Sequence, residues 1–263
     1  MRKTTPFSIS PNPALLYITP SINSALQKVR HVVDYRQGLT AIMGDNGHGK
    51  STILRLLWNE MLERDDVKSI ALLSPSYNSV FAFLKAIAGE FGLQHRRSQS
   101  AQENELREFL GSVAEEDKTA VVFVDEAQKL PGNQLELVRT LLNYETAEYK
   151  LIQIVLVAQL ELHIKLLDES KKALRSRLFV PSILSPLSPE ETRAMIGFRC
   201  QQAGEANPFS AETVERIYNQ TGGVPREVLK VCQIAWVEQQ KQGVKGIPPE
   251  WIEPLSSEVS LNG

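Results

Sequence analysis

Residues 44–52 have the composition and spacing of a phosphate-binding loop. They match the pattern G-x-x-x-x-G-K-[ST] and read Gly44-Asp45-Asn46-Gly47-His48-Gly49-Lys50-Ser51-Thr52. In such a loop, backbone N–H groups and a helix N-terminus present partial positive charge to phosphate oxygens. We expect these nine residues to bind phosphate groups. Lys50 would reach the β- and γ-phosphates, and the Ser51 hydroxyl would coordinate Mg²⁺.

The segments on either side of the loop fit this chemistry. An apolar, strand-like run at 39–43 precedes it, and residues 53–62 follow with apolar side chains at helical spacing. A strand, a glycine-rich turn and a helix start together form an anion site. The alternative is a glycine-rich turn that binds nothing, but a Lys-Ser-Thr ending has no evident use in a plain turn.

Two carboxylates give the second chemical signal. The run Val121-Val-Phe-Val ends in Asp125 and Glu126, so a strand delivers both acids at its carboxyl end. Ligands of open α/β sheets bind at that edge. We expect Asp125 to hold Mg²⁺, directly or through water, and Glu126 to orient and activate an attacking water. The alternative is that Asp125 caps the start of a helix.

Four further polar residues are candidates for contact with a γ-phosphate. Gln159 follows an apolar strand, Arg175 and Arg177 lie on a helix-to-strand turn, and Arg226 starts a later helix. An arginine can stabilise the charge that develops during phosphoryl transfer. The alternatives are an ordinary loop glutamine, surface arginines in a turn that also has two lysines, and an exposed charge at a helix start.

The chain alternates strand-like and helical segments up to about residue 185. Apolar runs lie at 39–43, 69–73, 120–124, 151–157 and 178–180, and amphipathic segments lie at 78–91, 101–114 and 133–146. This order predicts an α/β fold with a parallel sheet flanked by helices.

Only helices are expected after residue 185. The spacing and the Ser, Pro and Gly signals predict helices over about 189–203, 211–221 and 225–242. We therefore expect an α/β nucleotide-binding domain at 1–186, a small all-helical lid domain at 187–254 and a flexible tail at 255–263.

Composition narrows the class of protein. The 263 residues carry a formal net charge of −2, so nucleic-acid binding would need a local basic patch or an oligomer that aligns weak ones. No apolar run reaches the roughly 18 residues of a membrane span, and no apolar region follows the charged N-terminus. The four histidines lack metal-ligand spacing, and the two cysteines fit a reduced pair. A cytoplasmic protein is expected.

The ordered set of signals resembles the AAA+ ATPases, a group of P-loop NTPases. Within them the chain is similar to the ExeA/GspA-type ATPases of type II secretion and to the TnsC, TniB and MuB group of transposition regulators. The resemblance is carried by the loop and by four further segments, Pro6-Phe-Ser-Ile-Ser-Pro-Asn-Pro-Ala-Leu-Leu-Tyr17, Phe123-Val-Asp-Glu-Ala-Gln128-Lys-Leu, Gln153-Ile-Val-Leu-Val-Ala-Gln159 and Leu187-Ser-Pro-Glu-Glu-Thr192.

This resemblance implies an ATPase with ATP and Mg²⁺ as its cofactors. Gln159 matches sensor 1, Arg226 matches sensor 2, and Arg177 matches the arginine finger better than Arg175 does. The finger would act on the ATP of a neighbouring copy, so a homo-oligomer is implied, either a ring or a helical filament. Residues 7–20 would lie near the adenine.

The resemblance also implies the partners. The secretion ATPases continue into a membrane span and a periplasmic domain that this sequence does not contain, which favours the DNA-associated relatives. We therefore expect a switch that assembles on double-stranded DNA and recruits a transposase or target-selection protein. Candidate DNA contacts are Lys85, Arg96, Arg97 and Lys129. The alternative is a cytosolic secretion or assembly ATPase with protein partners only.

Two other readings are less favoured. An ABC-type or SMC-like subunit needs a Leu-Ser-Gly-Gly-Gln-like signature before the Asp-Glu strand, and residues 53–120 contain none. A catalytically inactive scaffold is disfavoured because Lys50, Asp125, Glu126 and an arginine are all present.

Overall fold

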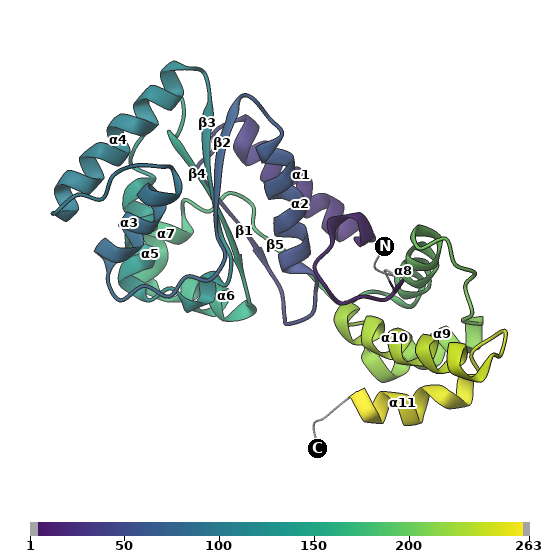
Figure 1. Cartoon of the computed structure of the whole chain (residues 1–263). Helices are drawn as coiled ribbons and strands as arrows, with labels where there is room; N and C mark the ends of the chain where they lie inside the picture. The colour runs from purple at the N-terminus through teal and green to yellow at the C-terminus, as the bar shows by residue number, and fades with distance from the viewer. Residues whose placement is uncertain (1–4, 260–263) are drawn as a thin grey trace. The chain divides into compact units, whose positions relative to one another are not determined.

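A five-stranded parallel sheet forms the centre of the α/β unit (Figure 1). The computed structural model describes residues 5–259. The strand order is β2-β3-β4-β1-β5, and every pairing is parallel. The strands are β1 Leu39–Met43, β2 Val67–Leu72, β3 Thr119–Val124, β4 Ile152–Ala158 and β5 Ser182–Ile183. The parallel sheet expected from the alternating apolar runs is confirmed.

Helices cover both faces of this sheet (Figure 1). They are α1 Pro20–Asp34, α2 Lys50–Leu62, α3 Val80–Glu90, α4 Gln99–Glu115, α5 Gly132–Leu141, α6 Leu160–Leu167 and α7 Lys172–Arg175. Short 3-10 turns lie at Ala127–Lys129 and Glu169–Lys171. Every residue of β1, β3 and β4 is buried, as expected for strands covered on both sides.

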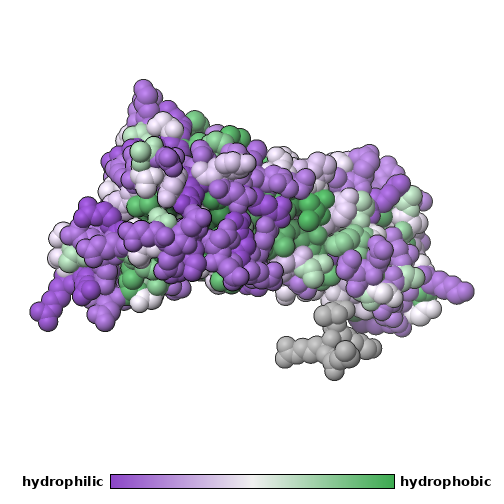
Figure 2. Space-filling model, turned by 90° about the horizontal axis from the view of Figure 1, so that it is seen from above, coloured by the Kyte–Doolittle hydropathy of each residue, from purple (hydrophilic) through white to green (hydrophobic). Residues whose placement is uncertain are grey.

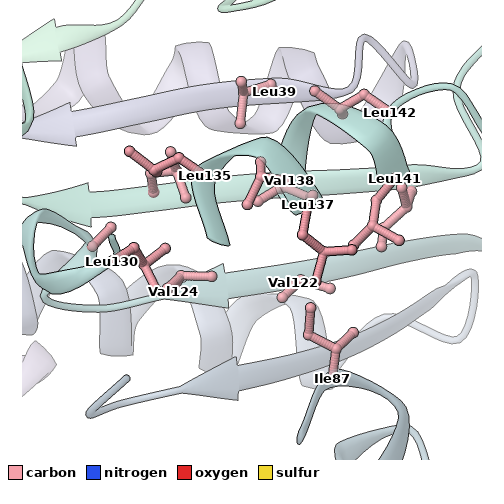
Figure 3. Packing of buried hydrophobic residues seen from close by; sticks show 14 of the residues in the cluster. Leu39, Ile87, Val122, Val124, Leu130, Leu135, Leu137, Val138, Leu141 and Leu142 are labelled. Carbon is pink, nitrogen blue, oxygen red and sulfur yellow. The ribbon is translucent and has the colours of Figure 1, made fainter. Parts of the chain in front are cut away.

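One face of the sheet packs against α3, α4, α5 and α6 in a single apolar cluster. Figure 3 shows Leu135, Val138 and Leu141 of α5 lying over the sheet beside Val122 and Val124 of β3. Side chains two residues apart on a strand share a face. This packing fixes the rotation of each strand, and therefore which residues stand at its carboxyl end.

The last strand differs from the sequence prediction. We expected it at 178–180, but β5 is Ser182–Ile183, and Leu178 forms only an isolated parallel bridge to Leu39. Val180 interrupts the run because its φ of 31° is positive. A β-branched residue strains the backbone in that region. The helix expected at 133–146 likewise ends at Leu141.

A second compact unit is helical. It contains α8 Pro189–Gln202, α9 Ala211–Thr221, α10 Pro225–Gln242 and α11 Ile252–Val259, which Figure 1 draws in green to yellow. Ser188 caps α8 in a reciprocal capping box with Glu191. The expected helices after residue 185 are present with nearly the expected bounds.

By contacts, residues 5–19 and the loop segment Asn46–Gly49 group with this helical unit, whereas Pro20–Asp45 and Lys50–Leu184 form the α/β unit. Phe7 anchors the N-terminal segment, since it is fully buried and meets Phe209 edge to face at a centroid distance of 5.4 Å. The sequence-based division at 186 placed these segments in the α/β domain, and its domain boundaries stay a prediction.

The flexible tail expected at 255–263 stays a prediction, but most of this segment is helical. Helix α11 continues through Leu255 to Val259, and residues 260–263 lie outside the described part of the chain. Between residues 5 and 259 no helix has both the length and the apolar character needed to cross a bilayer. The face seen in Figure 2 is mostly hydrophilic, with smaller hydrophobic areas between the polar ones.

Gln153 is a buried polar residue of the central strand β4, and its side chain forms hydrogen bonds with two backbone groups. Its Oε1 accepts the Gly38 N–H at 2.6 Å, and its Nε2 donates to the Lys150 carbonyl at 2.8 Å.

The substitution Gln153→Met keeps the volume of the side chain but leaves both backbone groups unpaired. We expect a loss of about 2–4 kcal/mol in the free energy of unfolding, measured by urea titration. The exposed control Gln99→Met should change it by less than about 0.5 kcal/mol. Equal effects would contradict this role.

Candidate active site

Parallel pairing brings three strand ends to one edge of the sheet. Met43 of β1 pairs with Ala158 of β4, and Val124 of β3 pairs with Leu156 of β4. The loop that follows β1, the carboxylates that follow β3 and Gln159 after β4 therefore share this edge. In open α/β sheets this is the edge at which ligands bind.

The loop places a buried lysine among its own carbonyl groups. Gly47 and Gly49 both have φ of 85°, a conformation that favours glycine. Helix α2 begins at Lys50, whose Nζ donates to the carbonyls of Gly44 and Asp45 at 2.8 Å each. Lys50 is only 7% exposed. The ammonium group is thus held inside the curve of the loop, next to the N-terminus of a thirteen-residue helix.

The remaining loop residues divide between surface and interior. Asp45 and Asn46 are exposed, whereas His48 is buried. Ser51 and Thr52 are half-buried on the first turn of α2. The loop therefore leaves its first part open to solvent while its end is fixed by the helix.

Ser51 and Asp125 meet across the edge of the sheet. The Ser51 Oγ lies 3.3 Å from Asp125 Oδ2 and donates a hydrogen bond to it, and the Glu126 N–H donates to Asp125 Oδ1 at 2.9 Å. Burial raises the pKa of Asp125 above its usual value. A hydroxyl and a carboxylate oxygen at this spacing fit a hard cation such as Mg²⁺, which prefers oxygen ligands.

Glu126 has an unusual backbone conformation, and its carboxylate lies next to donor groups of Gln128 and Lys129. Its φ of 51° lies in the left-handed region. Gln128 Nε2 donates to Glu126 Oε2 at 2.8 Å, and Lys129 Nζ lies 3.3 Å from the same oxygen. Burial alone would raise the pKa of Glu126, but these two partners lower it overall, so the carboxylate form is favoured.

Gln159 stands at the carboxyl end of β4 as the N-cap residue of α6. Its side chain makes no capping bond, but its backbone N–H donates to Gln128 Oε1 at 3.0 Å. Gln128 is a site residue to which the sequence reasoning assigned no role. The only signal was its place two residues after Glu126 in the run Asp-Glu-Ala-Gln.

The structure does not bring Arg175 and Arg177 to this edge. Arg175 Nη1 donates to the carbonyls of Leu166 and Leu167 at 2.8 and 2.9 Å, which closes the C-terminal end of α6. Arg177 donates to Ala173 O at 3.2 Å and to Asn143 Oδ1 at 2.9 Å.

The next residue after Arg177, Leu178, bridges to Leu39 at the first position of β1. The phosphate loop follows the last position of the same strand. Arg177 therefore lies near the opposite edge of the sheet from its own loop.

Arg226 lies in the helical unit together with the loop segment Asn46–Gly49. Its N–H, on the first turn of α10, donates to the Gly47 carbonyl at 3.2 Å. A Cβ on Gly47 would lie 3.0 Å from the side chains of both Arg226 and Val224. A side chain at this position would therefore press on Val224 and Arg226, in addition to being strained by the positive φ.

The four cations expected to contact DNA do not make one free basic patch. Lys85 lies over the ring of Phe81 at 4.3 Å, Lys129 pairs with Glu126, and Arg96 forms a two-pronged ion pair with Glu105. Arg97 is exposed. Two of these four charges are thus balanced by neighbouring carboxylates.

Comparison with known proteins assigns the sequence to a family. The profile of the AAA domain family matches residues 33–166, slightly more than half of the chain. General secretion pathway protein A of Aeromonas hydrophila is 33% identical over 258 residues, which is 97% of this chain and 47% of that protein. The chain thus spans less than half the length of this curated relative.

Solved structures show the same fold. The ORC2 protein of Aeropyrum pernix, in ADPNP–ADP complexes, aligns with a TM-score of 0.70 at 15% identity over 100% of this chain and 73% of that one. Cdc6p of Pyrobaculum aerophilum aligns with a TM-score of 0.70 at 19% identity, over 98% and 71%. The ORC1 protein of Aeropyrum pernix in complex with DNA aligns with a TM-score of 0.69 at 16% identity, over 98% and 69%.

These matches bear out the expected fold and the expected similarity to secretion proteins of the ExeA/GspA type. Because the identities are below 20%, the similarity to these solved structures supports the fold alone. The family follows from the sequence profile, which covers the phosphate-binding loop, Asp125, Glu126 and Gln159. This chain belongs to the AAA domain family.

Proposed function

We propose that the chain binds and hydrolyses ATP as a subunit of a cytoplasmic homo-oligomeric switch. The observation that carries this proposal is the contact between Ser51 of the loop and Asp125 after β3, beside the buried Lys50. A loop for phosphate and a carboxylate for its metal ion are then joined at one edge of the sheet. Membership of the AAA domain family supports the same reaction.

Each residue has a role that its surroundings support. Residues 44–52 would cradle the phosphates, with Lys50 on the β- and γ-phosphates, while Ser51 and Asp125 would hold Mg²⁺. When bound, the ion would neutralise charge on the phosphate oxygens. Glu126 keeps its carboxylate ionised and can accept hydrogen bonds from a water molecule, which orients that water for attack.

Gln159 and Arg226 would contact the γ-phosphate region. The carboxamide of Gln159 is not used to cap α6 and stands at the same sheet edge as Asp125. The side chain of Arg226 lies next to Gly47 of the loop, together with that of Val224. Both side chains carry donors, which suit phosphate oxygens.

Arg177 would act on the ATP of a neighbouring copy. Five residues of β1 separate the level of Leu178 from the loop, about 16 Å at 3.3 Å per residue. An arginine side chain is shorter than this, so Arg177 cannot complete its own subunit's site by extension alone. A head-to-tail contact between copies would bring the two together and would build a ring or a filament.

Two hypotheses describe the partners of this switch. By its resemblance to the TnsC, TniB and MuB group, the oligomer would assemble on double-stranded DNA and recruit a transposase or target-selection protein. A neighbour in fold is ORC1 in complex with DNA. The second reading is a secretion or assembly ATPase with protein partners only, which is favoured by the 33% identity to General secretion pathway protein A.

Glu126→Gln should separate ATP binding from hydrolysis. The amide keeps the size of the side chain but cannot act as a base, so we expect phosphate release to fall about 100-fold or more. Affinity for a non-hydrolysable ATP analogue should stay within about twofold of the parent. The exposed Glu115→Gln is the matched control and should behave as the parent. A variant that hydrolyses ATP at the parent rate would remove Glu126 from the mechanism.

A mixing experiment tests the shared site. Lys50→Ala and Arg177→Ala should each abolish turnover, the first through lost phosphate binding and the second through lost charge stabilisation. In a mixture, the intact loop of one variant can face the intact arginine of the other. We expect part of the activity to return, measured as phosphate release against the mixing ratio. A mixture as inactive as its components would argue against action between copies.

Arg175→Ala provides the comparison within the same turn. Because Arg175 bonds to the last carbonyls of α6, we expect this variant to lower thermal stability more than Arg177→Ala does. Loss of turnover in Arg175→Ala alone would reverse the assignment of the finger.

Gel-shift titrations distinguish the two classes of partner. If the oligomer binds DNA through many weak phosphate contacts, retention of duplex DNA should require ATP or its analogue and should weaken steeply between 50 and 200 mM salt, by about a thousandfold. Retention that is equal with and without nucleotide and insensitive to salt would rule out the DNA switch. No shift at low salt would support the reading with protein partners only.

A further inference from the structure

Gln128 lies between the two strand ends that carry Glu126 and Gln159, and none of the roles above uses it. It is the middle residue of the 3-10 turn Ala127–Lys129 that follows β3. We propose that Gln128 is a positioning residue, which sets the place of the Glu126 carboxylate by tying it to the backbone at the end of β4. This inference rests on the proposed hydrolysis of ATP.

The two hydrogen bonds of Gln128 fix the orientation of its carboxamide. Gln128 Oε1 accepts the Gln159 N–H at 3.0 Å, and Gln128 Nε2 donates to Glu126 Oε2 at 2.8 Å. A backbone N–H can only donate, so the oxygen of the amide must face Gln159. The NH₂ group is then directed at Glu126, where it requires an acceptor.

Glu126 needs such a partner because its backbone is in a strained conformation that its surroundings must hold. Its φ of 51° is sparsely populated for a residue with a side chain, and its side chain is 27% exposed. The other donor, Lys129, is 57% exposed and 3.3 Å away, and an exposed ion pair of this kind contributes little order. The neutral, half-buried Gln128 is therefore the partner that holds the carboxylate in one place.

The turn that carries Gln128 is itself held from α6. Lys165 Nζ donates to the backbone carbonyl of Gln128 and lies 3.4 Å from the carbonyl of Leu130. The Gln128 backbone is thus fixed independently of its side chain. A change of side chain at 128 should consequently alter the position of Glu126 without unfolding the turn.

The length and the chemistry of glutamine both matter for this bridge. Asparagine is one methylene shorter and cannot keep both bonds at these distances. Glutamate keeps an acceptor for the Gln159 N–H but places a carboxylate against Glu126. Methionine keeps the volume and loses both bonds.

The first test compares these three variants with the parent chain. We expect Gln128→Met and Gln128→Asn to lower kcat for ATP hydrolysis about tenfold, and Gln128→Glu to lower it further. The dissociation constant for a non-hydrolysable ATP analogue and the Tm should stay as in the parent. The exposed Gln99→Met is the control of matched chemistry. Unchanged kcat, or a loss of analogue binding equal to the loss of kcat, would overturn the proposal.

The second test asks whether Gln128 acts through Glu126. In a Glu126→Gln background there is no base to position, so adding Gln128→Met should leave single-turnover hydrolysis unchanged. A further tenfold fall in the double variant would show that Gln128 acts by another route, and would overturn the proposal.

The third test does not depend on hydrolysis. Loss of the acceptor should speed hydrogen exchange of the Gln159 amide about fivefold or more in nucleotide-free Gln128→Met. Protection equal to that of the parent would overturn the bridge itself. Absence of ATP hydrolysis in the parent chain, with faster exchange at Gln159 in the variant, would instead refute the proposed function and leave the bridge standing.

Discussion

The parallel pairing of β4 with β3 on one side and β1 on the other is the constraint from which the site follows. Every residue of β4 is buried, so an unpaired backbone group there would cost a full desolvation penalty. A slip of one residue would turn the apolar side chains of a strand to the wrong face. With the register fixed, Met43 lies beside Ala158 and Val124 lies beside Leu156, so the polar residues that follow the three strands come to one edge of the sheet.

Much of this arrangement is readable from the sequence because it depends on local pattern. The apolar runs predicted β1 to β4, and the glycine spacing predicted the loop whose Gly47 and Gly49 have positive φ. The helices α8, α9 and α10 followed from their capping residues. Helix α1 was missed although Ile22, Leu26, Val29 and Val33 show helical spacing and are buried, so the signal was present.

The parts that could not be predicted depend on contacts between distant segments. Nothing local indicates that Gln128 meets the Gln159 N–H, because the two are 31 residues apart and their meeting follows from the β3–β4 register. The position of β5 failed for another reason. An edge strand has one neighbour, so one residue with positive φ, Val180, is enough to shift it.

The two arginines at the end of α7 are candidates between which the sequence does not decide. Arg175 and Arg177 are chemically the same and two residues apart, so the sequence leaves both as candidates. Their partners differ. Arg175 satisfies two helix-end carbonyls that have no other partner within the helix, whereas Arg177 bonds to an exposed asparagine side chain and one carbonyl. Moving to a phosphate would therefore cost Arg177 less, in lost hydrogen bonds, than it would cost Arg175.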